Sequence, residues 1–203
     1  MAQNFRSIEN NQEKYQVYKI QIERFKKAKE QGFYFEGIFI LYAMLEDRLS
    51  AFLYHAGALN NQRQKLTTNK EVKPHLEAIL ESLGHRKYRI SNVSNKILIL
   101  KQILLYLQTH TNIDGSGHYP TVLYSQFLKL KRIDEIVPLL DLIREWCTSR
   151  NELVHALLIK NPDQQEEKLV MLNEDGYQYC RQLDNFIKTF KTGNTIRKQF
   201  NIQ

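Results

Sequence analysis

Apolar residues recur at three- and four-residue steps along most of this 203-residue chain. Such spacing places side chains on one face of a helix and predicts amphipathic α-helices. Over residues 8–31 the apolar positions are Tyr15, Tyr18, Ile22 and Phe25. Gly32 then provides a natural helix stop. Residues 33–55 are apolar around most of the helical circumference, which predicts a helix in the middle of a bundle or at a subunit interface.

Helical periodicity returns over residues 96–108, resumes near Val122 and runs through Trp146, and appears again over residues 169–190. Pro138 either kinks the middle segment or lies in the first turn of a helix. With only 8 Gly and 4 Pro, turn-rich β structure is disfavoured. The expected fold is therefore all-α, an up-and-down bundle of about five long helices.

The chain is expected to form one domain over residues 1–203, because it contains no repeat and no linker and is long enough to bury one core. The polar and basic composition of residues 57–95 predicts an irregular basic insertion with one short helix over residues 75–83. Residues 191–203 predict a basic tail that frays.

Charge and cysteine content indicate which kind of partner and which redox environment to expect. The chain has 29 Lys and Arg against 22 Asp and Glu, a net charge of +7, which favours a polyanion such as nucleic acid as partner. A basic surface kept for solubility is the alternative. Cys147 and Cys180 have no second cysteine nearby, so neither a metal site nor a redox pair is expected, and the setting is reducing. No secretory signal or membrane-spanning run is found, and we expect a cytoplasmic protein.

The segment Arg150-Asn151-Glu152-Leu153-Val154-His155 holds the strongest functional clue. Cleaving RNA without a metal requires a group of near-neutral pKa to move protons and a cation to stabilise the phosphorane. His155 and Arg150 are residues of these two types. Ser149 and Glu152 have capping-box spacing, which predicts a helix start that would place Arg150 beside free N–H groups favourable to a phosphate.

An Arg followed by a polar residue, with a His five places after the Arg, resembles the motif of the HEPN ribonucleases, which are small helical bundles. The resemblance implies a metal-independent endoribonuclease of the toxin or phage-defence kind that needs no cofactor. It assigns His155 as general acid and base, Arg150 as phosphate stabiliser and Asn151 as positioning residue. It also implies RNA as substrate, a homodimer with a composite active site, and an antitoxin or regulatory protein as partner.

The sequence departs from one variant of this family and leaves alternatives open. Some HEPN toxins carry a modifiable Tyr two places after the motif His, where this chain has Leu157. Arg48 and His55 also fit an Arg-to-His pattern, but Leu49 follows that Arg. The alternative interpretation of the motif is a solvated ion pair of Arg150 with Glu145 or Glu152, and a His155 bound to a neighbouring carboxylate. The alternative functions are a HEPN-like module that binds nucleotide, RNA or protein without cutting, and a structural helical adaptor.

Two further clusters are candidates for supporting roles. Glu46, Asp47 and Arg48 interrupt an apolar helix, where charges are usually paired and sometimes orient a catalytic group. The loop residues Arg86, Lys87, Tyr88 and Arg89 suit phosphate contacts and base stacking, with a solvated basic loop as the alternative.

One histidine pair raises the question of a metal. His110 and His118 flank Asp114, but their spacing matches no metal site, and none is assigned.

Overall fold

The computed structural model describes residues 11–81, 90, 92–109, 118–130, 133–156 and 165–202. In these residues the regular structure is helical, apart from one isolated β-bridge between Leu59 and Leu66. The predicted all-α class is therefore confirmed. None of the helices described has the length and apolar character needed to cross a membrane.

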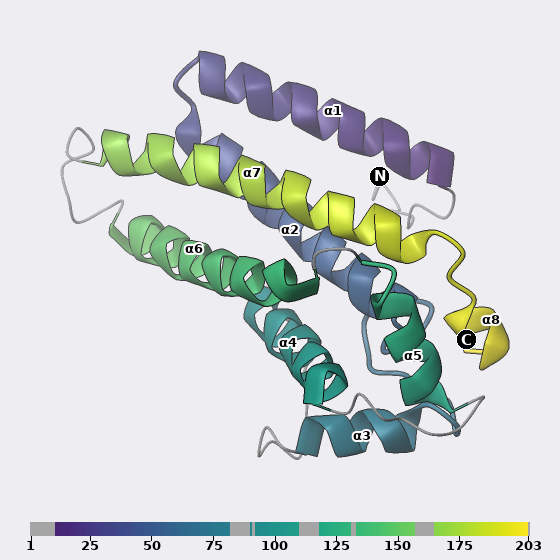
Figure 1. Ribbon diagram of the computed structural model, residues 1–203. Coiled ribbons are helices and arrows are strands. Elements are labelled where there is room, and N and C mark those ends of the chain that lie inside the picture. The colour runs from purple at the N-terminus through teal and green to yellow at the C-terminus, as the bar shows by residue number, and fades with distance from the viewer. Residues whose placement is uncertain are drawn as a thin grey trace, which may run out of the picture.

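Five long helices account for most of the described residues (Figure 1). They are α1 (Asn11–Glu30), α2 (Tyr34–His55), α4 (Val93–Thr109), α6 (Ile136–Ala156) and α7 (Glu166–Lys191). The shorter elements are α3 (Lys73–Glu81), α5 (Tyr119–Phe127), the 3-10 helix η1 (Ile133–Glu135) and α8 (Ile196–Gln199). Helix α2 packs against α1, α4 and α7, and α6 packs against α4 and α7.

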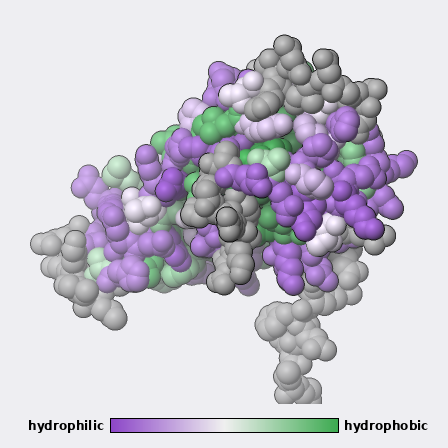
Figure 2. All heavy atoms as spheres, turned by 90° about the horizontal axis from the view of Figure 1, so that it is seen from below, coloured by the Kyte–Doolittle hydropathy of each residue, from purple (hydrophilic) through white to green (hydrophobic). Residues whose placement is uncertain are grey.

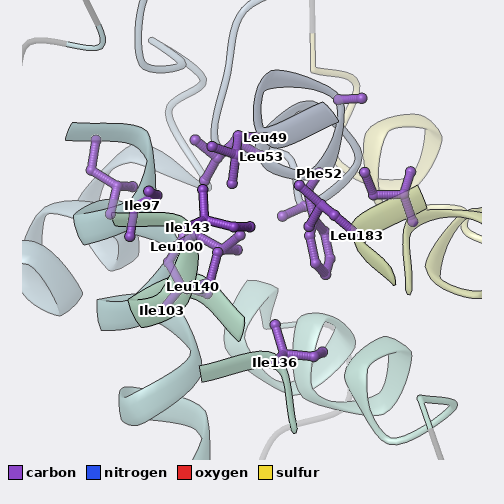
Figure 3. Close-up of a cluster of buried hydrophobic side chains, with 14 of the residues drawn as sticks. Leu49, Phe52, Leu53, Ile97, Leu100, Ile103, Ile136, Leu140, Ile143 and Leu183 are labelled. Atoms are coloured by element: carbon purple, nitrogen blue, oxygen red, sulfur yellow. The ribbon is translucent and has the colours of Figure 1, made fainter. Parts of the chain in front are cut away.

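The core is built around α2, as its nearly continuous apolar circumference leads one to expect. Its buried side chains meet those of the surrounding helices in one cluster (Figure 3). The cluster includes Leu49, Phe52 and Leu53 of α2, Ile97, Leu100 and Ile103 of α4, Ile136, Leu140 and Ile143 of α6, and Leu183 of α7. Polar side chains cover much of the lower face of the molecule, with apolar ones visible between them (Figure 2).

Two glycines allow α7 to lie close to its neighbours. A Cβ atom on Gly37 of α2 would lie 2.0 Å from Oδ1 of Asn173, and one on Gly176 of α7 would lie 2.8 Å from Cζ2 of Trp146. The Trp146 ring is held in place because its Nε1–H donates a hydrogen bond to the carbonyl of Leu172 at 2.8 Å. These contacts fix α2, α6 and α7 at short separations.

The helical pattern from Val122 through Trp146 corresponds to two helices, because α5 ends at Phe127 and α6 begins at Ile136. A turn follows α5, in which the N–H of Leu130 donates to the carbonyl of Phe127 at 2.9 Å. The side-chain amide of Gln126 is buried and donates to the carbonyl of Phe190, which ties this end of α5 to α7. Pro138 is the third residue of α6, so it lies in the first turn and causes no kink.

The tail predicted to fray is instead packed over residues 196–202, so that prediction is wrong. Ile196, Phe200 and Ile202 are buried, with exposed fractions of 1%, 3% and 6%. The Arg197 guanidinium donates to the carbonyls of Tyr54, Leu59 and Ile202. Burial of three apolar side chains and the hydrogen bonds of Arg197 together offset the entropy lost on ordering the segment, although its basic residues suggested a solvated end.

Within residues 57–95, the described part contains both regular structure and core residues. Helix α3 spans Lys73–Glu81, two residues earlier than the predicted short helix, and α4 begins at Val93. Ala58, Leu59 and Val72 are fully buried. The connection from α2 to α3 is therefore part of the core.

Replacing Gly176 with alanine tests the close packing of α7. Alanine has the higher helix propensity, by up to about 1 kcal/mol, but its methyl group would press on the fixed Trp146 ring. We expect Gly176→Ala to lower the free energy of unfolding by about 1–3 kcal/mol in urea titrations. Gln178→Ala, at an exposed position of α7, should change it by less than about 0.5 kcal/mol. A stabilised Gly176→Ala protein would contradict this packing.

Candidate functional site

Helix α6 runs without interruption through the motif, from Ile136 to Ala156. The capping box predicted at Ser149 is therefore wrong, and Arg150 lies near the end of a helix and not in its first turn. The physical reason is that the apolar face of α6 continues past Ser149 to Leu153, which is 1% exposed. Burial of that face favours a continuous helix over the local capping interaction. Arg150 consequently has no free helix N–H groups beside it, and only its side chain can attract a phosphate.

The Arg150 guanidinium lies against two aromatic rings of α2. Its central carbon is 4.5 Å from the ring centroid of Tyr42 and 5.0 Å from that of Phe39. A guanidinium at this distance from a ring is attracted by the negative π face. Nη1 donates a hydrogen bond to Oδ1 of Asn151 at 2.9 Å. Arg150 is thus held by two rings and one amide.

Hydrogen-bonding capacity remains on this guanidinium. Nε of Arg150 is buried and has no hydrogen-bond partner among the described residues. The carboxylates considered as its ion-pair partners lie elsewhere: Glu152 pairs with Lys168 at 3.5 Å, and no ion pair joins Arg150 to Glu145 within the described residues. Because Nε is buried, only the two Nη atoms are left to bind an anionic ligand, and Nη1 already donates to Asn151.

Glu46 of α2 lies on the same side of the core as Arg150. Burial raises the pKa of the Cys147 thiol to about 12; Arg150 acts to lower it, and Glu46 acts to raise it further. Burial likewise raises the pKa of Tyr42, and the same two charges act on it in opposite directions. The Glu46 carboxylate accepts a hydrogen bond from Nζ of Lys96 at 2.7 Å, an ammonium whose side chain is only 7% exposed. Glu46 is therefore a paired charge close to Arg150.

Asp47 and Arg48 face the opposite side of α2, toward α1 and α7. Asp47 accepts hydrogen bonds from Lys14 and from the hydroxyl of Tyr18. Burial alone would raise the pKa of Asp47, but Lys14 and these hydrogen bonds outweigh it and lower the pKa below its ordinary value. Arg48 lies 3.0 Å from the Asp184 carboxylate of α7. The charged triplet is thus divided, and only Glu46 is brought near the motif.

His155 is exposed in the last turn of α6. It makes no hydrogen bond or ion pair with the residues that the structure describes. Five residues of helix separate it from Arg150, an advance of about 7.5 Å and a net rotation of about 140°. The two side chains therefore leave different faces of one helix.

The rival pair, Arg48 and His55, differs in both geometry and chemistry. Positions seven residues apart on a helix differ by only about 20° in direction, so the side chains of Arg48 and His55 share a side of α2. Burial, with the nearby charges of Lys191 and Arg63, lowers the pKa of His55 to about 3. Such an imidazole stays neutral near pH 7 and is too weakly basic for efficient general catalysis. Arg48 is already committed to Asp184, so this pair is poorly suited to proton transfer.

The remaining candidates are placed as follows. Arg86, Lys87, Tyr88 and Arg89 lie outside the described residues, as do His110 and Asp114. Among the described residues no group of three His, Cys, Asp or Glu side chains is arranged to hold a metal ion. Cys147 and Cys180 are buried free thiols, and burial raises the pKa of each to about 12. Neither thiol is suited to nucleophilic chemistry.

The aromatic support of Arg150 was missed from the sequence. Phe39 and Tyr42 are three residues apart and share one face of α2, a spacing that core packing also produces. The one distinguishing signal is exposure, since Phe39 is the large apolar side chain of α2 that is exposed, at 49%, and exposure is a property of the fold.

Comparison with known proteins gives no independent assignment. No family model, no curated protein and no solved structure matches this chain significantly.

The low pKa of His55 predicts a pH effect on stability. The unfolded chain binds a proton at His55 below about pH 6.5, whereas the folded chain does so only near pH 3. Stability therefore falls as the pH drops through this window, with a slope of up to about 1.4 kcal/mol per pH unit. Urea titrations from pH 7 to 4 should show a shallower loss for His55→Gln than for wild type. His118→Gln, an exposed control, should follow wild type, and equal slopes for all three would contradict the assignment.

Proposed function

We propose that this protein is a metal-independent endoribonuclease in which Arg150, Asn151 and His155 act at a composite site formed by two copies of the chain. The observation that carries the proposal is the contrast between the two Arg-to-His pairs. His55 is held neutral beside cations, whereas His155 is exposed and Arg150, unlike Arg48, forms no ion pair with the described residues. The net charge of +7 and the resemblance of the motif to HEPN ribonucleases support RNA as the substrate.

In the proposed reaction, one imidazole removes the proton from a ribose 2′-OH, and the oxygen attacks the adjacent phosphorus. The bond to the 5′-oxygen breaks, and a second, protonated imidazole gives its proton to that leaving oxygen. The products carry a 2′,3′-cyclic phosphate and a 5′-hydroxyl. Arg150 stabilises the extra charge of the phosphorane through N–H donors fixed in advance by Phe39, Tyr42 and Asn151.

Two copies of the chain are required for two reasons. Each copy offers one motif imidazole, while the reaction uses a base and an acid. The rotation of about 140° between Arg150 and His155 also favours pairing the Arg of one copy with the His of the other. A two-fold axis brings both pairs to one scissile phosphate. Glu46 would influence the site through charge, and Asp47 and Arg48, which bind α1 and α7, are given no part in it.

Substitution of the motif tests the assignment. We expect Arg150→Ala and His155→Ala to lower kcat for RNA cleavage in EDTA by about 100-fold or more, since each removes a group that acts in the transition state. Arg150→Lys should fall between wild type and Arg150→Ala, because it keeps the charge and loses the planar donors. Arg144→Ala, at an exposed position on the same helix, and His118→Ala are matched controls that should cleave normally. Wild-type rates in both motif variants would refute the proposal. Circular dichroism checks that a variant with lowered activity is still folded.

Mixing subunits tests the composite site. Wild-type and His155→Ala chains are unfolded together, refolded at varied ratios, and assayed at constant total protein. If both imidazoles serve one site, a mixture of equal amounts of the two chains has about a quarter of the activity of pure wild-type protein. The reason is that only dimers with two wild-type chains are fully active, and these form about a quarter of all dimers. Independent sites in each chain would leave about half, which would exclude the composite site.

Binding of RNA without cleavage is the second candidate function. The separate faces occupied by Arg150 and His155 in one chain favour it, since a binding module needs no converging acid and base. Incubating the wild-type protein with total RNA in EDTA separates the two: fragments support the nuclease, and intact RNA that comigrates with the protein supports the binding module.

A further inference from the structure

We infer that the groove between α1 and α7 binds single-stranded RNA, with phosphates along its lysines and a base stacked on Tyr15. The groove has a volume of about 650 Å³, and Arg48 of α2 contributes to its lining. Helices α1 and α7 lie beside each other along its length (Figure 1). The choice of RNA over other polyanions rests on the proposed function, while the binding surface itself is argued from its own residues.

The groove is strongly basic. Six cationic side chains line it, namely Lys14, Lys19, Lys26, Arg48, Lys188 and Lys191, against two acidic ones, Glu23 and Asp184. Asp184 is neutralised from two sides, by Arg48 at 3.0 Å and by Lys188 at 2.6 Å. The positive charge that remains creates a field that attracts a chain of phosphates.

Three of these lysines are available to a ligand. Lys19, Lys26 and Lys191 are exposed and form no ion pair with the described part of the chain. Lys14 differs, because it is bound to Asp47, and burial lowers its pKa. A row of exposed ammonium groups gathered in one groove is costly through mutual repulsion, and a bound polyanion relieves that cost.

The groove is elongated and follows the helix axis. Tyr15, Lys19, Ile22 and Lys26 recur at steps of four, three and four residues, so they lie along one face of α1. From Lys14 to Lys26 the helix advances about 18 Å. That length suits several consecutive phosphates of an extended strand better than a single compact anion.

Tyr15 adds an aromatic surface to the groove. It is 67% exposed, one of the most exposed large side chains described, and it lies among the lysines. Tyr18 is not equally available, because its hydroxyl binds Asp47 and the Arg48 guanidinium covers its ring at 3.8 Å. A free ring in a basic groove is a stacking platform for an unpaired base. Duplex bases are already stacked on each other, so a single strand is the occupant that uses both features.

The test measures RNA binding in a His155→Ala background, so that the outcome does not depend on whether RNA is cut. Fluorescence anisotropy follows a labelled single strand of about 12 nucleotides. We expect Lys19→Glu, Lys26→Glu and Lys191→Glu combined to weaken binding by at least about tenfold and to lower the slope of log affinity against log salt by about 2. Tyr15→Ala should weaken binding by roughly 5- to 150-fold, and Tyr15→Phe should restore it.

The matched control combines Arg24→Glu, Lys27→Glu and Lys70→Glu, which makes the same change in net charge at exposed positions outside the groove. Loss of binding in the groove variant with retention in this control supports the inference, even if the wild-type protein proves unable to cleave RNA. Equal binding by the two triple variants would overturn it, whether or not the protein is a nuclease. Equal affinity for duplex RNA and no effect of Tyr15→Ala would overturn the assignment of a single strand.

Discussion

The enclosure of α2 is the constraint on which the rest of the structure depends. This helix is apolar around most of its circumference, so water must be excluded from nearly every side of it. Each fully buried Leu or Phe contributes about 1.5–3 kcal/mol, and Leu41, Leu45, Leu49, Phe52 and Leu53 are all completely buried. Helices α1, α4 and α7 surround α2, and Arg150 of α6 covers two of its rings.

Enclosure also decides what the charges on α2 can do. A charge on a helix surrounded by neighbours is costly unless it is paired, and each of the three charges at residues 46–48 has a partner on a different helix. Glu46 binds Lys96 of α4, Asp47 binds Lys14 of α1, and Arg48 binds Asp184 of α7. These pairs point to two different sides of α2. One side carries Glu46, Arg150 and the proposed catalytic residues, and the other carries Arg48 and the basic groove.

Long elements were predictable from the sequence because their signals extend over many residues. The sequence predicts a helix over residues 33–55, and the structure has one at Tyr34–His55, which follows the glycine stop at Gly32 and carries apolar residues along its whole length. Signals confined to a few residues failed where distant contacts opposed them. No helix begins at the capping spacing of Ser149, because the buried face of α6 continues to Leu153. The basic tail is ordered because Arg197 donates hydrogen bonds to the carbonyls of Tyr54 and Leu59. The ring support of Arg150 joins two helices distant in the chain, so no local pattern reports it.

The fragment ends distinguish the proposed reaction from hydrolysis by a metal-activated water. Attack by the 2′-OH leaves a cyclic phosphate on one fragment and a hydroxyl on the other, whereas attack by a metal-activated water leaves different ends. The most direct measurement is mass spectrometry of the fragment ends after wild-type protein has cleaved a defined RNA in EDTA. The account predicts 2′,3′-cyclic phosphate and 5′-hydroxyl ends. Fragments ending in 5′-phosphate and 3′-hydroxyl, or no cleavage until a divalent metal is added, would contradict it.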